Sequence, residues 1–411
     1  MSGTILRGSR TYWRASIALF LAAFSVFAAI YCVQPLLPIF ASEFNLTATE
    51  SSVAISAATG TLSVSLLLVS WLGNRFDRKR LMTISLLATS ALVIAMALAS
   101  DWAAFILVRA LIGVAVCGVP AIAMVYLGEE MDTAALGFGM GMFVGGSAIG
   151  GMSGRLLMGL LLEVVTWREA LLMLGVAILV NAIGFALLLP KPRNSATGVL
   201  SFPEFLSNLH HVVSDKALRL LLLCSFLLMG LFVAIYNYVA FHLLAPPYSL
   251  SPAAVAPIFA VYLVGTIASA TIGSVAGLVG RRKVLWPMML VIIAGLLVTL
   301  APPLWAVIVG LAITTFGFFG AHSTASAWVA RRSGPARAQG SALYLLAYYA
   351  GSSLLGTAAG LGWSYWQWPG VVASCLVFAL TGLAVTFRLA VIPPLAASGG
   401  LAPLSSSAPE R

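Results

Sequence analysis

The scarcity of charged residues along long apolar stretches constrains this chain more than any other feature of its sequence. Only 8% of its 411 residues are charged, 61% are hydrophobic, and the mean hydropathy is +1.04. A soluble protein needs roughly a quarter of its residues charged to cover its surface. Most of the exterior must therefore face lipid. Because the basic residues form short clusters between apolar runs, the net charge of +10 does not indicate nucleic-acid binding.

Twelve apolar segments are long enough to cross a membrane as helices, because about 20 apolar residues span roughly 30 Å of hydrocarbon. The first follows Arg7, Arg10 and Arg14, but it is too long for the core of a cleavable signal peptide, so we interpret it as an uncleaved helix. The spans are expected at 15–40, 51–72, 81–99, 103–127, 134–160, 167–190, 217–243, 253–279, 284–301, 304–329, 338–362 and 369–392.

The connections between these spans alternate in charge. One set carries basic clusters, among them 75–80, 191–219, 281–283 and 331–337, whereas the alternate set has Arg168 as its one basic residue. The positive-inside rule places the basic connections and both termini in the cytoplasm. An even number of spans satisfies this arrangement. We expect a multi-pass protein of the inner membrane.

An internal repeat divides the chain into two halves. The matching segments are FAAIY (27–31) with FVAIY (232–236), GGSAIGGMSG (145–154) with GSSLLGTAAG (351–360), and loop 70–80 with loop 273–283, at offsets of 205, 206 and 203 positions. Such a repeat predicts two parallel, pseudo-symmetric six-helix bundles that rock around a site between them. The expected parts are a bundle over 1–192, a flexible cytoplasmic linker over 193–216, a bundle over 217–392 and a disordered cytoplasmic tail over 393–411.

Glycines recur at short intervals in the fifth and eleventh spans. Small residues at this spacing let helix backbones approach closely. Tight packing explains most of them, and their repetition in both halves suggests that the contact is also a sliding surface. They are Gly146, Gly150, Gly154, Gly351, Gly356 and Gly360.

The loop after the second span resembles the signature of the major facilitator superfamily between helices two and three. The residues concerned are Asn74, Arg75, Asp77, Arg78, Lys79 and Arg80. The basic positions match, whereas Asn74 replaces the family's aspartate and Asp77 replaces a glycine. In that family the loop gates the cytoplasmic side, so the resemblance implies a gate here. The change at Asn74 removes the acid of its charge relay.

Two further motifs and several longer stretches extend the resemblance. RALIG (109–113) is similar to the family's second motif, and GSAIGGMSGR (146–155) to its antiporter motif, with Gly151 replacing a proline and Arg155 the last glycine. Stretches such as YLGEE and GFFGAHSTASAW resemble bacterial inner-membrane permeases of the YnfM type, grouped near drug and sugar exporters. The resemblance covers nearly the whole chain and implies the major facilitator fold.

Three ionisable residues lie deep in the predicted spans: Arg109, Arg155 and His322. Such a residue costs at least about 2.5 kcal/mol on insertion scales and indicates function. Both arginines could extend to the outer headgroups, but Arg155 lies among the repeated glycines and is expected to face the protein. His322 is a candidate proton carrier, since its charge changes near neutral pH. The alternative for His322 is a hydrogen-bonded structural role.

Polar and aromatic residues mark the expected cavity between the halves. Gln34 and Asn237 stand on spans of equal rank, and a buried amide needs a partner. The tyrosines could instead pack or lie at the membrane interface. The expected cavity residues are Tyr31, Gln34, Arg109, Arg155, Tyr236, Asn237, Tyr344 and Tyr348.

The sequence lacks the main motifs of enzymes and ATP-driven pumps. It contains no HExxH, GxxxxGK or GxSxG. Its four cysteines fall in apolar segments without metal spacing, so neither a metal nor a cofactor is expected. A membrane enzyme would need a cluster of reactive groups at one depth, and a sensor would need a soluble domain.

We therefore expect a secondary transporter that works as a monomer, with lipid, a small solute and protons as partners. Proton-coupled export is the expected mode. A deep acid that would attract a lipophilic cation is missing from the spans, while two arginines supply positive charge. A neutral polar or anionic solute is the expected substrate, and a multidrug efflux antiporter is the alternative.

Overall fold

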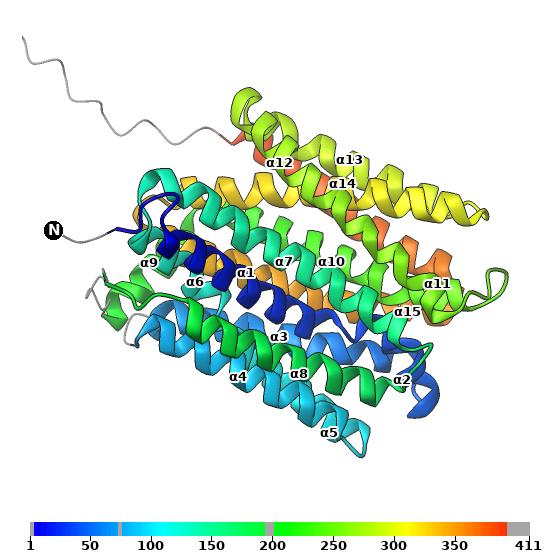
Figure 1. The fold of residues 1–411 in the computed structure, drawn as a ribbon. Helices are drawn as coiled ribbons and strands as arrows, with labels where there is room; N and C mark the ends of the chain where they lie inside the picture. The colour runs from blue at the N-terminus through cyan, green and yellow to red at the C-terminus, as the bar shows by residue number, and fades with distance from the viewer. Residues whose placement is uncertain (1–3, 73–75, 194–200, 393–411) are drawn as a thin grey trace, which may run out of the picture.

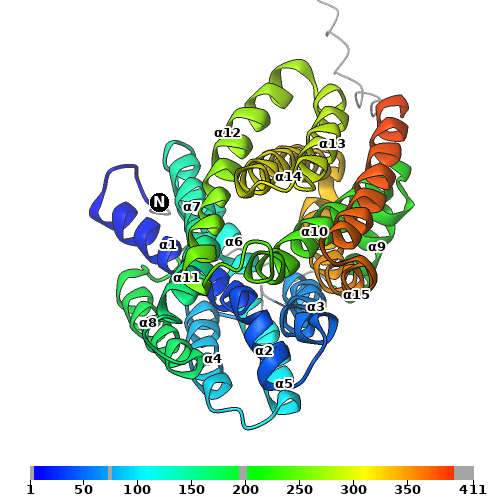
Figure 2. The same cartoon turned by 90° about the vertical axis from the view of Figure 1, so that its right-hand side faces the viewer.

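The computed structural model describes residues 4–72, 76–193 and 201–392, and this part of the chain is almost entirely helical. The long helices run side by side (Figure 1). Seen end-on in Figure 2, the helices of the first half gather on one side and those of the second half on the other. The described residues contain no strand, only an isolated bridge between Ile5 and Met131. The predicted all-α fold class is confirmed.

The elements of the first half are α1 (Arg10–Tyr31), η1 (Gln34–Leu36), α2 (Leu37–Glu43), α3 (Ala48–Leu72), α4 (Arg78–Ala97), α5 (Trp102–Val116), α6 (Pro120–Glu130), α7 (Thr133–Leu161) and α8 (Trp167–Leu188). After α9 (Phe202–Ser214), those of the second half are α10 (Lys216–Leu244), α11 (Pro252–Val255), η3 (Ala256–Val261), α12 (Tyr262–Val279), α13 (Arg281–Val298), α14 (Leu304–Arg332), η4 (Gly334–Ala336) and α15 (Arg337–Val391).

Ten helical segments of the described chain are long and apolar enough to cross a membrane. The last of them has 58 residues, and its backbone leaves helical geometry at Trp366 (φ −135°, ψ 17°) and Gln367 (φ 52°, ψ −136°). α15 therefore consists of two helices joined by a break. α13 begins with three basic residues and is not among the ten. The count of twelve spans stays a prediction. Counting the two helices of α15 separately and adding α13 would bring the ten segments to twelve.

Every aspartate of the chain stands at the amino end of a helix. Asp77, Asp101, Asp132 and Asp215 cap α4, α5, α7 and α10, and each accepts a hydrogen bond from the amide three residues later. The first amides of a helix have no partner within it, and the helix dipole stabilises a negative charge there. Capping therefore explains why the aspartates mark the ends of spans and not their interiors.

The two halves pack their helices in the same order. α1 lies along α7, and α10 lies along α15; α3 packs on α5, and α12 on α14; α4 packs on α8, and α13 on α15. These pairs join elements of equal rank, so the repeat in the sequence corresponds to a repeat in the packing. The limits of the two bundles near residues 192 and 217 stay a prediction.

The halves meet along three contacts. α3 lies along α15, α7 contacts α11, η3 and the start of α12, and α10 contacts η1, α2 and α3. The last two contacts are at the end of the molecule that carries Glu43, Asp101 and Glu163, which we call the acidic end. The opposite end, which we call the basic end, carries α9 and the first residues of α1, α4 and α13 (Figure 1).

The linker differs from the flexible segment expected over 193–216. Its described part forms α9, whose first turn is fixed by a capping box between Ser201 and Glu204. The rings of Phe202 and Phe205 lie 5.0 and 6.1 Å from that of Trp71 at the end of α3. α9 also packs on α10 and α15. The expectation of a flexible linker was wrong for α9, which is helical and buries Phe205 and Val212, whereas most of its other side chains are exposed, as expected of a solvated segment.

Candidate functional site

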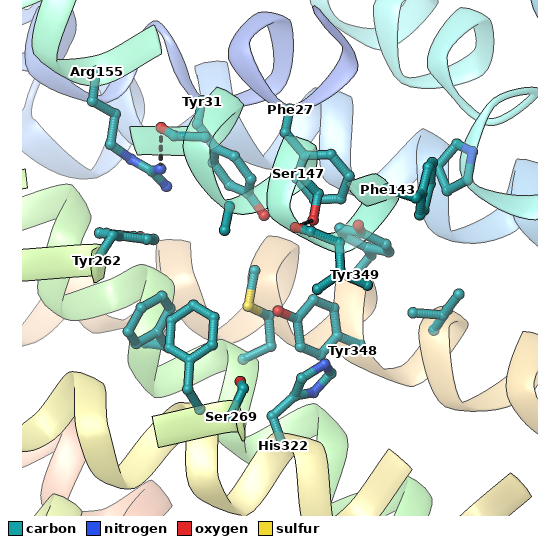
Figure 3. A pocket seen from close by; sticks show the side chains of 18 of the residues that line it. Phe27, Tyr31, Phe143, Ser147, Arg155, Tyr262, Ser269, His322, Tyr348 and Tyr349 are labelled. Carbon is teal, nitrogen blue, oxygen red and sulfur yellow. Dashed lines mark hydrogen bonds between the residues drawn. The ribbon is translucent and has the colours of Figure 1, made fainter. Parts of the chain in front are cut away.

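A cavity of about 230 Å³ lies between the two halves at mid-height of the long helices. Helices α1, α6, α7, α10, α12, α14 and α15 line it, and Figure 3 shows the side chains that face it. Eight of these side chains are Phe or Tyr. The other polar groups are Ser147, Arg155, Ser269 and His322. Walls of aromatic and other apolar side chains with a few polar groups are typical of a site for a small organic solute.

Arg155 is a buried cation on the wall of this cavity, with 1% of its surface exposed. Its Nε donates to Oε1 of Gln34, and its Nη1 donates to the Gly151 carbonyl at 2.6 Å. Its guanidinium carbon lies 4.2 Å from the ring centre of Tyr31 and 4.4 Å from that of Tyr262 (Figure 3). None of the three ion pairs in the described chain includes Arg155. Amide dipoles and ring faces therefore balance its charge there.

The hydrogen bond from Arg155 to Gln34 is the first of a chain of hydrogen bonds that crosses the boundary between the halves. Gln34 Nε2 donates to Asn237 Oδ1 at 2.7 Å, and both amides are fully buried. Asn237 Nδ2 has no partner among the described residues. One turn beyond Arg155, a Cβ on Gly159 would lie 2.7 Å from that of Ala256 in η3. The cavity is therefore closed toward the acidic end by contacts between the halves.

Arg109 does not line the cavity, contrary to the expectation from its depth. It is fully buried, and it donates to the carbonyls of Ala29 (2.9 Å), Ile30 (2.7 Å) and Ala54 (2.6 Å). The first two carbonyls belong to the last turn of α1, just before the turn at Cys32. Carbonyls of a last helical turn lack partners within the helix. Arg109 supplies these partners from α5 and so joins α1, α3 and α5.

His322 and Tyr348 face the cavity from the second half (Figure 3). The His322 ring centre lies 4.7 Å from that of Tyr348, and its Nδ1 is 3.0 Å from the hydroxyl of Tyr344 behind it. Tyr236 is fully buried and pairs with Thr315 at 2.8 Å, away from the lining. The structure thus brings Tyr31, Arg155, His322 and Tyr348 to the cavity, and it places Gln34, Asn237, Tyr236 and Tyr344 behind its wall.

Several lining residues are not among the cavity residues expected from the sequence, including Phe27, Phe232, Tyr262 and Tyr349. A signal for two of them was present. Phe27 and Phe232 open the repeated segments FAAIY and FVAIY, and both line the cavity. Tyr262 and Tyr349 carried no such signal, because an aromatic residue in an apolar span is most often a packing residue.

The predicted gate loop is described only in part. Asn74 and Arg75 lie outside the described residues. Arg78 is buried and pairs with Glu129 at the end of α6, and Lys79 donates to the Leu189 carbonyl. Asp77 caps α4 and Arg80 is exposed. The bonds of the described loop residues lie within the first half, so a gating role stays a prediction.

The repeated glycines lie where helices of one half touch. A Cβ on Gly146, Gly150 or Gly154 would overlap the backbone of α1, and one on Gly351 would overlap the Phe226 backbone of α10. Gly356 faces Val233 of α10, and Gly360 faces Tyr238 of α10 as well as Thr49 of α3. Five of the six glycines therefore pack within a half. The structure gives them a packing role, whereas the predicted sliding surface would need contacts between the halves.

Alanine at Gly150 is expected to destabilise the protein, because its Cβ would meet the Phe24 backbone, which cannot move aside easily. Overpacking of this kind costs about 1–3 kcal/mol. The matched control is Gly141→Ala in the same helix, where nothing lies within 4 Å of the added Cβ and alanine favours the helix. The melting temperature in detergent should fall for Gly150→Ala and hold or rise for Gly141→Ala. Equal melting temperatures would contradict the packing role.

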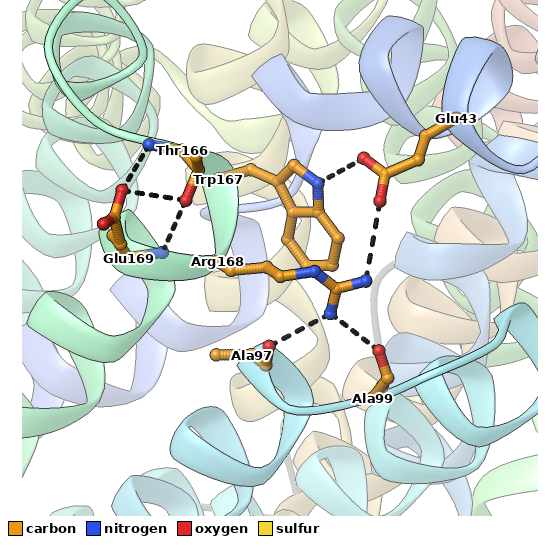
Figure 4. A network of polar contacts seen from close by, with 7 residues as sticks. All are labelled: Glu43, Ala97, Ala99, Thr166, Trp167, Arg168 and Glu169. Atoms are coloured by element: carbon orange, nitrogen blue, oxygen red, sulfur yellow. Dashed lines mark hydrogen bonds and ion pairs between the residues drawn. The ribbon is translucent and has the colours of Figure 1, made fainter.

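A polar network holds the first half together at the acidic end (Figure 4). Glu43 accepts a hydrogen bond from Trp167 Nε1 at 2.5 Å and lies 3.5 Å from Arg168 Nη2. Arg168 also donates to the carbonyls of Ala97 (3.1 Å) and Ala99 (2.7 Å). These bonds tie α2, α8 and the end of α4 together. They explain why one basic residue stands among the otherwise acidic connections.

Comparison with known proteins agrees with this architecture. The model of the Major Facilitator Superfamily matches residues 19–269. The chain is 41% identical over 386 residues to the uncharacterized MFS-type transporter YybF of Bacillus subtilis (strain 168), covering 94% of this chain and 96% of that one. It is 37% identical over 385 residues to the inner membrane transport protein YnfM of Escherichia coli (strain K12), with coverages of 94% and 92%.

Solved structures show the same fold at low sequence identity. A bacterial homolog of the human lysosomal transporter Spinster, in an inward-facing and unoccupied conformation, matches with a TM-score of 0.77 at 15% identity and covers 93% of this chain and 98% of its own. A mutant of the nucleoside transporter NupG matches with a TM-score of 0.73 at 16% identity, with coverages of 92% and 98%. Together with the family match and the relatives above 30% identity, these findings show that the chain belongs to the major facilitator superfamily and is a membrane-embedded transporter.

Proposed function

We propose that this transporter carries a small organic anion by alternating access, with Arg155 as the group that binds it. The observation that carries this proposal is a buried guanidinium on the cavity wall without an ion pair in the described chain. Arginine presents five donors in a rigid fork that suits carboxylate and phosphate groups. Two of these donors are used by Gln34 and Gly151, which leaves others for a solute.

The same arginine supports a link between binding and opening. Gln34 accepts from Arg155 and donates to Asn237, so one chain of hydrogen bonds joins the binding group to the second half. Opening toward the acidic end has to break the bond between Gln34 and Asn237. An anion that draws Arg155 away from Gln34 would weaken this connection and so favour that opening.

We further propose that His322 carries the coupled proton and that the chain is not an enzyme. His322 lies on the cavity wall opposite Arg155 in Figure 3, within reach of the Tyr344 hydroxyl and the solute space. Histidine changes charge near neutral pH. Export is the proposed direction because the sequence resembles exporters. The cavity lies within one chain, which supports a monomer as the working unit.

One observation favours a second candidate, a multidrug efflux antiporter. Eight Phe and Tyr side chains line the cavity, and such walls also suit large apolar compounds. A lipophilic cation, however, would meet the like charge of Arg155 in a medium of low polarity. The charge of the preferred solute therefore separates the two candidates.

The test is flux in vesicles that contain the purified protein. Labelled carboxylates, phosphorylated compounds, sugars and a quaternary ammonium dye are offered with and without a pH gradient. The proposal expects saturable flux of an anion, raised by the gradient and slowed in His322→Gln. Robust export of the dye that is unaffected by replacement of Arg155 would overturn the anion assignment and favour the antiporter.

We propose that the basic end faces the cytoplasm, since its connections carry the positive clusters. A reporter fused after residue 200 or 411 should then report the cytoplasm, and one fused near Thr166 should report the opposite side. Thr166 caps α8 at the acidic end, so its reporter is the internal contrast. A non-cytoplasmic signal from either of the first two fusions would show that the orientation is wrong.

A further inference from the structure

A second cavity lies at the basic end and shares no residue with the site between the halves. It is an open hollow of about 460 Å³, lined by the end of α12, the start of α13 and the end of α14. The turn between α12 and α13 lies at the same end of the molecule as α9 (Figure 1). The lining residues are Val279, Gly280, Arg281, Arg282, Lys283, Trp328, Arg331 and Arg332. Five of these eight are basic and none is acidic.

Most of these cations are not neutralised within the described chain. Four of them take part in none of its ion pairs: Arg281, Arg282, Lys283 and Arg331. Arg332 is held by Asp215 at 2.8 and 2.9 Å, and the Arg282 guanidinium lies 5.8 Å from the Trp328 ring. Like charges gathered in one hollow repel each other. An anion in the cavity would relieve this repulsion.

The internal repeat shows that the second half lacks, at this cavity, an ion pair that the first half has. In the first half, Arg78 at the start of α4 pairs with Glu129 at the end of α6. The loops of the two halves match at an offset of 203 positions, and 203 positions after Arg78 stands Arg281. At the same offset from Glu129 stands Arg332. The second half therefore has a guanidinium, held by Asp215, where the first has a carboxylate, so Arg281 has no carboxylate partner in the described chain like the one that Arg78 has.

The backbone and the surroundings of the cavity specify the kind of anion. α13 starts at this cavity after Gly280 (φ 97°), and no side chain caps it. Amides at an uncapped helix start favour phosphate groups. Beside the cavity, Leu278 is 87% exposed and Val279 is 48% exposed. Apolar surface next to basic groups, at the end of membrane-spanning helices, fits a molecule with a charged head and apolar chains.

We propose that this cavity binds the phosphate headgroup of an acidic phospholipid, with its acyl chains along the exposed end of α12. Basic pockets between helix ends on the cytoplasmic side bind such headgroups. The headgroup phosphate takes the place that Glu129 holds in the first half, between the start of one helix and the end of the next. The lipid thereby fixes α13 against α14 without contributing to the solute cavity.

The test uses the full-length protein in detergent, with lipid binding followed by native mass spectrometry. Phosphatidylglycerol, phosphatidylcholine and inorganic phosphate are the three probes. The double variant Arg282→Gln, Arg331→Gln should bind phosphatidylglycerol at least about tenfold more weakly, since each basic residue near an anionic lipid contributes appreciably. The matched control is Arg7→Gln, Arg10→Gln, which removes the same charge from exposed positions at the same end and should bind as the parent does.

Each arm of this experiment decides one point. Equal affinity of the parent protein for phosphatidylglycerol and phosphatidylcholine would overturn the site, as would equal weakening in the control. Binding of inorganic phosphate with displacement of the lipid would overturn the lipid assignment in favour of a free anion. The comparison of the three probes on the parent protein remains informative even if the double variant does not fold. Raised salt should weaken the binding of phosphatidylglycerol to the parent protein.

Discussion

Replacing Arg155 by glutamine is expected to slow transport of an anionic solute about 10- to 100-fold, because a hydrogen bond to a charged group contributes about 1.5–3 kcal/mol. The variant should remain folded, since glutamine can still donate to Gln34 and the cavity tolerates a smaller side chain. Initial rates of solute uptake into vesicles measure the effect. Arg155→Lys keeps the charge without the planar fork, so its transport rate should lie between those of the parent and Arg155→Gln.

Arg168→Gln is the matched control for Arg155→Gln. It removes an arginine of the same half that lies at the acidic end, 36% exposed and away from the cavity. Its effect on uptake should be small, because Arg168 lies away from the cavity and its ion pair with Glu43 is exposed. Anion transport that proceeds at the parent rate in a folded Arg155→Gln protein would contradict the binding role of Arg155.

The fold class could be predicted from the sequence because lipid restricts the choice. A chain with this little charge has to bury its backbone polar groups within helices. The internal repeat also indicated which spans have equal rank, and the packing of α1 on α7 and of α10 on α15 follows that ranking. The pairing of Gln34 with Asn237 was suggested by rank, and the two amides are hydrogen bonded.

The different roles of the two deep arginines could not be predicted from the sequence. Arg109 and Arg155 are of the same type and at similar depth, and no pattern along the chain separates them. Their roles depend on the direction in which each side chain leaves its helix and on the break that follows Tyr31 in α1. Arg109 donates to the carbonyls at the end of α1, whereas Arg155 lies against the tyrosine rings of the cavity.

The helix within the linker was not expected, for a different reason. Its mixed charges and prolines are typical of a solvated segment. Phe202, Phe205 and Val212 nevertheless recur at helical spacing, and this signal predicts an amphipathic helix. What the sequence could not supply is the position of Trp71, which closes the end of α3 against α9.

Replacing Arg109 by methionine is expected to prevent stable folding, not only to reduce transport. The substitution leaves the Ile30 carbonyl without a donor and the Ala29 carbonyl with only the weak Cys32 thiol, both in a fully buried place. The Ala54 carbonyl loses only its second donor, because it lies inside α3. Each unsatisfied buried group costs about 1–3 kcal/mol, which for the two carbonyls at the end of α1 is a sizeable part of the roughly 5–15 kcal/mol that stabilises a folded protein. Melting in detergent and the fraction of monodisperse protein measure the loss.

Arg14→Met provides the control, because Arg14 also donates to a backbone carbonyl, that of Leu187 at 2.9 Å, but from an exposed position where water can replace it. Its melting temperature should stay near that of the parent. Arg109→Lys should be almost as harmful as the methionine variant, since one ammonium group cannot match the three directions of the guanidinium. A folded Arg109→Met protein that melts like the parent but fails to transport would show instead that Arg109 acts on the solute, as its depth in the sequence first suggested.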